Sequence, residues 1–200
     1  MRIERAVNYV EALGPGKRLC VWVNGCSRGC EGCVSARLQR IDESTEVEIE
    51  EYFLGYNLRA IDGVTVSGGE PFQQIDGLYK LVRYFKRRGV KDILVYTGYT
   101  LQQLREMKDG QVDGILENVS VLIDGPYVAA LDDGRGNLKG SDNQQIHYLD
   151  ESVKEKYEAY LSQERKVQEM QMANVLLGVG IPTKEYIEKF NQTTLQKEKN

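Results

Sequence analysis

Histidine is nearly absent from this sequence, and that scarcity limits the metal sites it can build. One histidine, His147, occurs in 200 residues, so sites that need several imidazole ligands are excluded. No apolar run approaches the roughly 20 residues that a helix needs to cross a bilayer. The first ten residues, MRIERAVNYV, include charged side chains and no apolar central block, so they do not resemble a secretory signal. We therefore expect a cytoplasmic protein without a membrane partner.

Positive charge is also in short supply. The chain carries 26 Lys and Arg against 30 Asp and Glu, which gives a net charge of -4. This balance argues against a large nucleic-acid interface. The remaining composition, with 41% hydrophobic residues, is typical of a folded globular protein that is long enough to bury a core.

Cysteine is scarce as well, but three of the four cysteines are crowded together. Cys26, Cys30 and Cys33 lie within NGCSRGCEGC (24–33), a spacing typical of a loop folded around an iron–sulfur cluster. The fourth, Cys20, lies in an expected strand among apolar residues, where a free cysteine commonly packs as a small hydrophobe. Three protein ligands would leave one iron of a four-iron cluster open, and an open metal position is where a substrate binds and is activated.

The pattern of apolar residues and turn formers predicts strands and helices in alternation. Strands are expected at 17–25, 63–71, 92–98 and 119–126, and helices at 44–56, 73–89 and 101–107. Strands that alternate with helices pair in parallel, so the expected fold class is α/β, with an open sheet or a partial (βα) barrel.

The expected helices carry recognisable end signals. The 44–56 helix has Ser44 or Thr45 as its N-cap, and Thr100 caps the 101–107 helix. Gly89 is expected to end the 73–89 helix. The residues that share the apolar face of that helix are Ile75, Leu78, Leu81, Val82 and Phe85.

Beyond position 126 the pattern changes. Residues 127–149 are polar and contain glycine, which is more typical of a functional loop or lid than of a simple connection. Residues 150–200 predict a surface helix and a β-hairpin that turns near Ala173–Asn174 and is closed by Pro182. We therefore expect a core domain at 1–149 and a C-terminal helix and hairpin extension, 150–200, packed on it.

The unusual stretches of the sequence follow the ends of the expected strands. The cysteine loop comes after the first strand, and SGGEP (67–71), TGYT (97–100) and DGP (124–126) end the next three. The carboxyl ends of parallel strands meet at one rim, where such folds carry their chemistry. These four stretches are therefore expected to form one site.

Together, these motifs resemble a known family. The three clustered cysteines are similar to the C-x-x-x-C-x-x-C signature of radical S-adenosylmethionine enzymes. They occur in order with GPGKR (14–18), SGGEP, YTGYT (96–100), DGPY (124–127) and GSDNQ (140–144). This ordered set resembles the glycyl-radical-enzyme activases, most closely those of anaerobic ribonucleotide reductase, over about residues 7–149.

The resemblance implies a partial barrel of the radical S-adenosylmethionine type and a set of cofactor-binding residues. Cys26, Cys30 and Cys33 would hold a 4Fe-4S cluster whose open iron binds S-adenosylmethionine. The positions that would contact this cofactor are Gly68 and Gly69 through their backbone, Glu70 near the methionyl amine, Thr97 and Gly98 on its far side, and Asp124 at a ribose hydroxyl or a polar substrate group. For SGGEP, TGYT and Asp124, a plain turn or a loop-fixing role is the alternative.

The resemblance also implies an activity and partners. The cluster would reduce S-adenosylmethionine, giving methionine and a 5′-deoxyadenosyl radical that takes a hydrogen from a glycine Cα of a partner enzyme. A low-potential electron donor of the flavodoxin or ferredoxin type is implied as well.

Three features depart from the activase pattern. VSARLQ (34–39) lacks the usual aromatic and Asn-containing pattern, Gln145 stands where an arginine is often seen, and about fifty C-terminal residues exceed the compact activase. One alternative is a radical S-adenosylmethionine enzyme that modifies another peptide or a small molecule. The other is a non-enzymatic zinc or iron–sulfur module with Cys20 as its fourth ligand. His147 alternates with apolar residues and is expected to be structural.

Overall fold

The computed structural model describes residues 1–172, 175–183 and 185–189 of the chain. Its strands are β1 (Ile3–Val10), β2 (Arg18–Val23), β3 (Gly63–Gly68), β4 (Ile93–Tyr96), β5 (Val121–Asp124), β6 (Gln145–Tyr148), β7 (Val167–Met172) and β8 (Val175–Gly180). Its helices are α1 (Ile49–Tyr52), α2 (Ile75–Arg87), α3 (Leu101–Glu106), α4 (Gly110–Leu116) and α5 (Lys154–Leu161).

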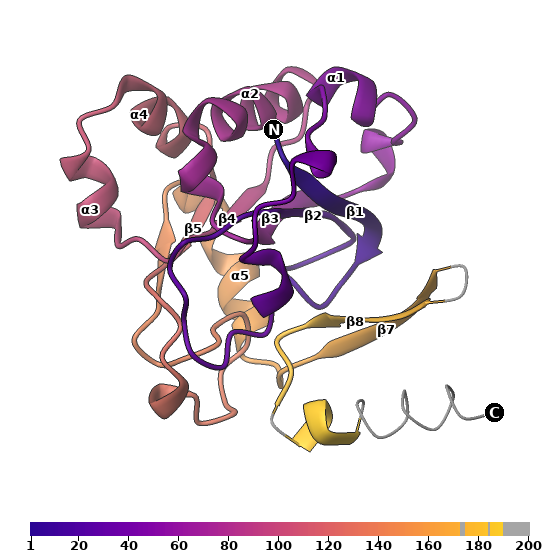
Figure 1. Cartoon of the computed structure of the whole chain (residues 1–200), viewed down its shortest axis with the longest axis vertical. Coiled ribbons are helices and arrows are strands. Elements are labelled where there is room, and N and C mark those ends of the chain that lie inside the picture. Colours follow the sequence, from indigo (N-terminus) through magenta and orange to yellow (C-terminus); the bar gives the residue numbers. More distant parts are fainter. Residues whose placement is uncertain (173–174, 184, 190–200) are drawn as a thin grey trace.

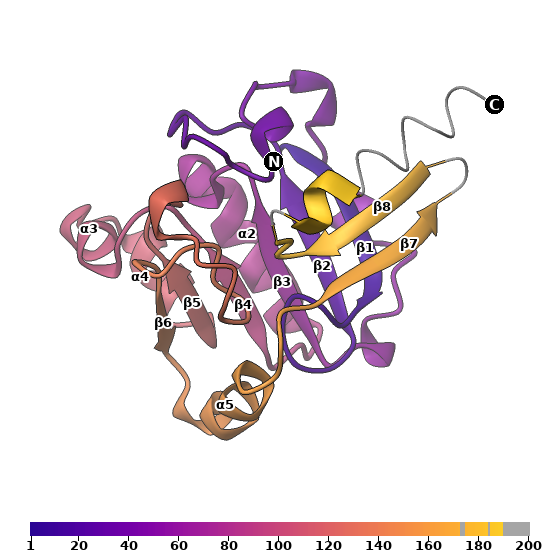
Figure 2. The same ribbon diagram turned by 90° about the horizontal axis from the view of Figure 1, so that it is seen from below.

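In the described part of the chain, a six-stranded sheet with the order β1-β2-β3-β4-β5-β6 forms the centre of the molecule. Helices α1, α2 and α4 cover one face of this sheet, and α5 and the β7–β8 hairpin lie on the other (Figure 1). Seen from below, the hairpin crosses in front of β1 and β2 (Figure 2). None of the helices that the structure describes is long and apolar enough to cross a bilayer.

The sheet confirms the predicted α/β class. Strands β2, β3, β4 and β5 pair in parallel, as strands joined by helical crossovers do. The two outer strands, β1 and β6, are antiparallel to their neighbours and were not predicted from the sequence. β1 has no regular alternation and its register shifts near Tyr9, whose φ is +62°, while β6 has only four residues. Both strands are thus recognisable only from their pairing.

Helix α2 confirms the prediction from its apolar face. Leu78, Leu81, Val82 and Phe85 are fully buried against the sheet, and Ile75 packs at the edge of the same core. Gly89, with φ of +84°, takes the left-handed conformation that ends the helix. The strongly one-sided burial explains why this element was predictable from spacing alone.

The predicted 44–56 helix is wrong in its extent and in its caps. Ser44 and Thr45 lie in a 3-10 turn capped by Asp42, and α1 begins only at Ile49. The backbone before α1 is extended because Glu46 bridges to Arg2 and the Val47 N–H donates to Met1. Pairing with the N-terminal strand therefore overrides the local helical signals.

The C-terminal extension covers the inner face of the sheet, the face opposite α2. Val153, Tyr157 and Tyr160 pack with apolar residues of β4 and β5, and Val179 packs with β1 and β2. The predicted surface helix and hairpin are both present, although the hairpin turn at Ala173–Asn174 lies outside the described residues. Within the described residues β7 and β8 pair only with each other, so the extension covers a face of the sheet and adds no strand to its edge.

Gln168 of β7 ties the hairpin to the irregular end of β1. Its side-chain amide donates to the carbonyl of Tyr9 at 3.1 Å, and its oxygen accepts from the N–H of Glu11 at 2.8 Å. One side chain thus satisfies two backbone groups that the bend in β1 leaves without strand partners.

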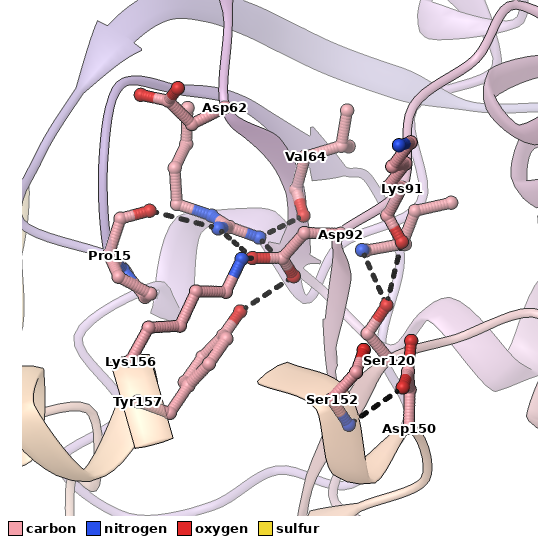
Figure 3. A network of polar contacts seen from close by, with 12 residues as sticks. Pro15, Asp62, Val64, Lys91, Asp92, Ser120, Asp150, Ser152, Lys156 and Tyr157 are labelled. Atoms are coloured by element: carbon pink, nitrogen blue, oxygen red, sulfur yellow. Dashed lines mark hydrogen bonds and ion pairs between the residues drawn. The ribbon is translucent and has the colours of Figure 1, made fainter. Parts of the chain in front are cut away.

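A buried ionic network at the amino ends of the strands fixes α5 against the sheet (Figure 3). The guanidinium of Arg18 donates to Asp92 at 2.9 Å and to the carbonyl of Val64 at 2.7 Å. Asp92 also accepts from the Tyr157 hydroxyl at 2.9 Å and pairs with Lys156 at 2.6 Å. The carboxylate therefore joins β2 and β4 to α5, at the end of the sheet remote from the cysteine loop.

Candidate active site

The structure brings the four motif-bearing loops together at the carboxyl ends of the parallel strands. After β3, the Gly69 N–H donates to the carbonyl of Val23 at 2.8 Å and the Glu70 N–H donates to Gly25 at 2.9 Å. After β4, the Thr97 hydroxyl donates to the Glu70 carboxylate at 2.8 Å. The expected meeting of the cysteine loop with SGGEP and TGYT at one rim is therefore present.

The cysteine loop is held at both ends by backbone and side-chain contacts. The N–H groups of Gly25 and Cys26 donate to the carbonyls of Leu38 and Gln39. Gln73, just beyond SGGEP, accepts from the Ser27 N–H at 3.0 Å and donates to its hydroxyl at 2.7 Å. These contacts hold the three cysteines next to the SGGEP turn. Gln73 was not singled out from the sequence, although it lies only two residues beyond the motif.

The donor set of this loop fits an iron–sulfur cluster. Cys26, Cys30 and Cys33 are free thiols and each is partly exposed. Burial, together with the charges of Glu70, Cys30 and Cys33, raises the pKa of the Cys26 thiol. Among the described residues no three His, Cys, Asp or Glu side chains converge as on a single metal ion. In a four-iron cluster each thiolate binds a different iron, so its ligands stand further apart than those of one ion.

Cys20 lies apart from this loop, as its apolar neighbours in the sequence indicated. It is 1% exposed and packs with Val7, Val10 and Leu13 on the inner face of the sheet. Burial raises the pKa of its thiol to about 12. Its place in this apolar cluster, away from the cysteine loop, supports the packing role that the sequence predicted.

Gly68 and Gly69 are required by the close approach of two backbones. Gly68 has φ of +111°, and a Cβ there would lie 2.4 Å from the backbone nitrogen and oxygen of Val23. A Cβ on Gly69 would lie 2.3 Å from the carbonyl oxygen of Gly25. Only glycine tolerates this approach at both positions, and at Gly68 the backbone conformation requires it as well, so the SGGEP turn can lie directly on the start of the cysteine loop. Their predicted contact with the cofactor stays a prediction.

Glu70 connects the loops after β3 and β4. Its carboxylate accepts hydrogen bonds from the Phe72 N–H, the Thr97 hydroxyl and the Gly98 N–H, the last at 2.7 Å. Burial raises the pKa of this carboxyl above its ordinary value, against the three donors. Glu70 therefore has a structural task that the sequence did not indicate, beside the predicted one near a methionyl amine.

Asp124 fixes the start of α3. Its carboxylate accepts from the Leu101 N–H at 2.6 Å and lies 2.9 Å from the imidazole of His147 in β6. These contacts support the loop-fixing alternative for Asp124 and the structural role expected of His147. The predicted contact of Asp124 with a ribose or a substrate group stays a prediction.

The motifs DGPY and GSDNQ form one unit. Asn143 donates to the carbonyl of Pro126 at 2.7 Å, and Gln144 donates to the carbonyl of Gly125 at 3.0 Å. The Val128 N–H donates to the Ser141 hydroxyl at 3.1 Å. The side chains of the second motif thus hold the backbone of the first.

Two aromatic contacts at the site were missed from the sequence. The guanidinium of Arg28, inside the cysteine motif, lies 4.6 Å from the ring centre of Tyr99 and next to Gly98. The ring of Tyr127 lies against Gly32, where a Cβ would meet it at 3.5 Å. The sequence offered one sign of these contacts, since Arg28 and Tyr127 lie inside the motifs. It did not show their partners, Tyr99 and Gly32, which come from loops far away in the sequence.

Comparison with known proteins agrees with this geometry. Residues 12–147 match the family model described as a 4Fe-4S single cluster domain. The chain is 33% identical over 144 residues to the anaerobic ribonucleoside-triphosphate reductase-activating protein of Escherichia coli (strain K12), covering 68% of this chain and 91% of that protein. It is 34% identical over 144 residues to the protein of that name from Salmonella typhimurium, with the same coverage, and 31% identical over 139 residues to that of Enterobacteria phage T4, covering 66% of this chain and 85% of that protein.

Proposed function

We propose that this chain, which belongs to the family of anaerobic ribonucleoside-triphosphate reductase-activating proteins, generates a glycyl radical on a partner enzyme of the anaerobic ribonucleotide reductase type. The chain is a radical S-adenosylmethionine enzyme with a 4Fe-4S single cluster domain. The observation that carries the proposal is the meeting of three motif loops around one carboxylate. Glu70 binds the loop that carries Thr97 and Gly98, while its own backbone lies on the start of the cysteine loop.

Each part of this rim has a task in the proposed reaction. Cys26, Cys30 and Cys33 would hold the 4Fe-4S cluster, and one iron would stay open for S-adenosylmethionine. Gly68, Gly69 and Glu70 would bind the methionyl part of this cofactor, and Thr97, Gly98 and Asp124 would bind the rest of it or the substrate. When bound, the cluster supplies the electron that cleaves S-adenosylmethionine into methionine and a 5′-deoxyadenosyl radical.

The chain's own residues hold the loops of the rim in position. The hydrogen bonds between Gln73 and Ser27 hold the cysteine loop in register with the SGGEP turn. The carboxylate of Glu70 keeps the turns after β3 and β4 at a fixed separation, which a cofactor bound across both turns requires. The cytoplasmic location and a low-potential donor of the flavodoxin or ferredoxin type are parts of the same proposal.

The first test is an assay for 5′-deoxyadenosine. Anaerobically purified protein is reconstituted with iron and sulfide, and S-adenosylmethionine and dithionite are added. We expect 5′-deoxyadenosine from the wild type and none from Cys30→Ala, because the variant loses one of the three cluster ligands. Cys20→Ser is the matched control, and it is expected to keep both the iron content and the product.

The second test addresses the partner. With a reductase of the anaerobic ribonucleotide reductase type present, electron paramagnetic resonance is expected to detect a glycyl radical that needs both proteins and S-adenosylmethionine. Formation of 5′-deoxyadenosine without a glycyl radical on the reductase would assign the chain to another substrate. Loss of the metal in Cys20→Ser, with no product from the wild type, would identify a closed metal module.

A further inference from the structure

Arg165, which lies between α5 and β7, is the centre of a set of hydrogen bonds to the loop after β5. Its side chain is 5% exposed. It donates to the carbonyls of Arg135 at 2.7 Å, Lys139 at 3.0 Å and Gly136 at 3.2 Å, and its Nη1 atom lies 3.2 Å from the carboxylate of Asp132. It also donates to the carbonyl of Pro182 at 3.4 Å. Within the loop, this planar guanidinium satisfies three carbonyls and one carboxylate, and so orders a segment that has little regular structure of its own.

Asp132 links Arg165 to Tyr127, a residue next to the cysteine loop. One carboxylate oxygen accepts from Arg165, and the other accepts from the hydroxyl of Tyr127 at 3.1 Å. The carboxylate is 10% exposed, and it also accepts from the Gly134 N–H at 3.1 Å. Asp132 therefore fixes the position of the Tyr127 ring relative to the extension.

Tyr127 in turn lies between two glycines. A Cβ on Gly32, in the cysteine loop, would lie 3.5 Å from its ring, and a Cβ on Gly140 would lie 3.1 Å from the opposite part of the ring. The ring thus forms a wall against the cysteine loop, directly before Cys33. A continuous series of contacts leads from Arg165 through Asp132 and Tyr127 to Gly32.

The extension holds the same loop at a second point. Leu138 is fully buried between the inner face of the sheet and α5, where it packs with Tyr157 and Tyr160, and Asn137 donates to the carbonyl of Tyr160 at 3.3 Å. Leu138 has φ of +68°, a conformation that a branched side chain adopts only when its surroundings impose it. The extension thus dictates the shape of the loop.

We propose that Arg165 is a positioning residue that, through Asp132 and Tyr127, presses the 126–144 loop against the cysteine loop and shields one side of the cluster from solvent. Arg165 lies outside residues 12–147, the part that matches the family model, so the support that it gives to the Tyr127 wall comes from the extension. The inference rests on the proposed function only in assuming that the cysteine loop carries a cluster.

The first measurement needs no cluster. Hydrogen–deuterium exchange is followed in the metal-free wild type, in Arg165→Ala and in Arg165→Lys, which keeps the charge but not the planar fork. Both variants are expected to exchange about tenfold faster in 126–144 and in 26–33, since the charge-assisted hydrogen bonds that order the loop are lost. Arg135→Ala, which removes an exposed arginine of the same loop, is the matched control and is expected to change neither segment.

The second measurement follows the bleaching of the reconstituted cluster by dioxygen. Arg165→Lys and Tyr127→Phe are each expected to speed bleaching several-fold, and the double variant no further, because both changes break the same series of contacts. Tyr127→Phe keeps the ring and buries no new charge, so its result stands even where an Arg165 variant folds poorly.

Faster exchange confined to 132–144, with an unchanged bleaching rate, would overturn the proposal. Additive effects of the two single variants would overturn it as well. Failure of the proposed function can be told apart from failure of this proposal. A protein that forms the cluster but makes no 5′-deoxyadenosine would fail the proposed function, yet its hydrogen exchange and cluster bleaching could still be measured and would still test the role of Arg165.

Discussion

The four cysteines have different roles because of their positions, not because of their spacing alone. Three lie in a partly exposed loop at the rim, whereas Cys20 points from β2 into an apolar cluster. The sequence allowed this separation, since Cys20 sits among Leu19, Val21 and Val23. It did not allow the role of Glu70 to be predicted, because the donors Thr97 and Gly98 lie 27 and 28 residues away.

Selective alkylation tests the separation of the cysteines. Because burial raises the pKa of Cys20 to about 12, its thiol is protonated at pH 8 and lacks the nucleophilic thiolate. Metal-free protein treated with iodoacetamide at pH 8 is expected to be modified at Cys26, Cys30 and Cys33 and not at Cys20, as read by peptide mass spectrometry. In urea all four should react. Equal labelling of Cys20 in the folded protein would contradict its burial.

At the scale of elements, the apolar pattern predicted the central strands and the long helix for different reasons. Strands β2 to β5 are buried on both faces and follow from short continuous apolar runs, whereas helix α2 buries one face and follows from its spacing. The 44–56 helix failed because Glu46 and Val47 pair with the N-terminus, a contact between distant segments that no local signal reports. The motifs located the rim because strand ends are local features. The link from Arg165 to the site could not be predicted in this way, since Arg165 and Asp132 are 33 residues apart.

The junction of β2 and β3 offers a test at this scale. Gly68→Ala would place a methyl group 2.4 Å from the backbone of Val23 at a φ of +111°, and backbone cannot move aside as a side chain can. Strain and overpacking together are expected to cost about 2–4 kcal/mol in the free energy of unfolding, measured by urea denaturation of the metal-free protein. Gly55→Ala, at a glycine with open space around it, is the control and should cost far less. Equal losses in the two variants would contradict the close approach.

At the scale of the whole molecule, the two ends of the sheet have different tasks. The carboxyl ends of the strands carry the cysteine loop and the motif turns, and the amino ends carry the network of Arg18, Asp92 and Tyr157 that docks the extension (Figure 3). A buried carboxylate with three partners stabilises this end only while it is ionised. Stability at this end therefore depends on pH.

Asp92→Asn tests this dependence. Burial opposes ionisation, but the charge and hydrogen bonds of Arg18 and Lys156 outweigh it, so the pKa of Asp92 lies below its ordinary value of 3.8. A lowered pKa contributes stability above the ordinary value, and that stability is lost as the pH falls through the folded-state pKa. At pH 7 the variant is expected to lose about 3–5 kcal/mol in the free energy of unfolding, because Arg18 keeps its charge without an anion.

The control for this prediction is Asp76→Asn, which removes an exposed carboxylate paired with Lys80 and should leave stability nearly unchanged. The difference between the wild type and Asp92→Asn should shrink below pH 3.8. A difference that stays constant down to the acid unfolding transition would rule out the ionised carboxylate as its source.

The hairpin that covers β1 and β2 has a consequence for how the chain folds during synthesis. Val7 and Val10 leave the ribosome early, yet their apolar partners Leu177 and Val179 follow about 170 residues later. Since synthesis adds roughly 5–20 residues per second, this face of β1 and β2 stays uncovered for on the order of 10 s before the hairpin is made. Such distant contacts also slow folding, since a long loop must close before they form. The apolar face of β1 and β2 is therefore a surface on which a chaperone can bind the nascent chain.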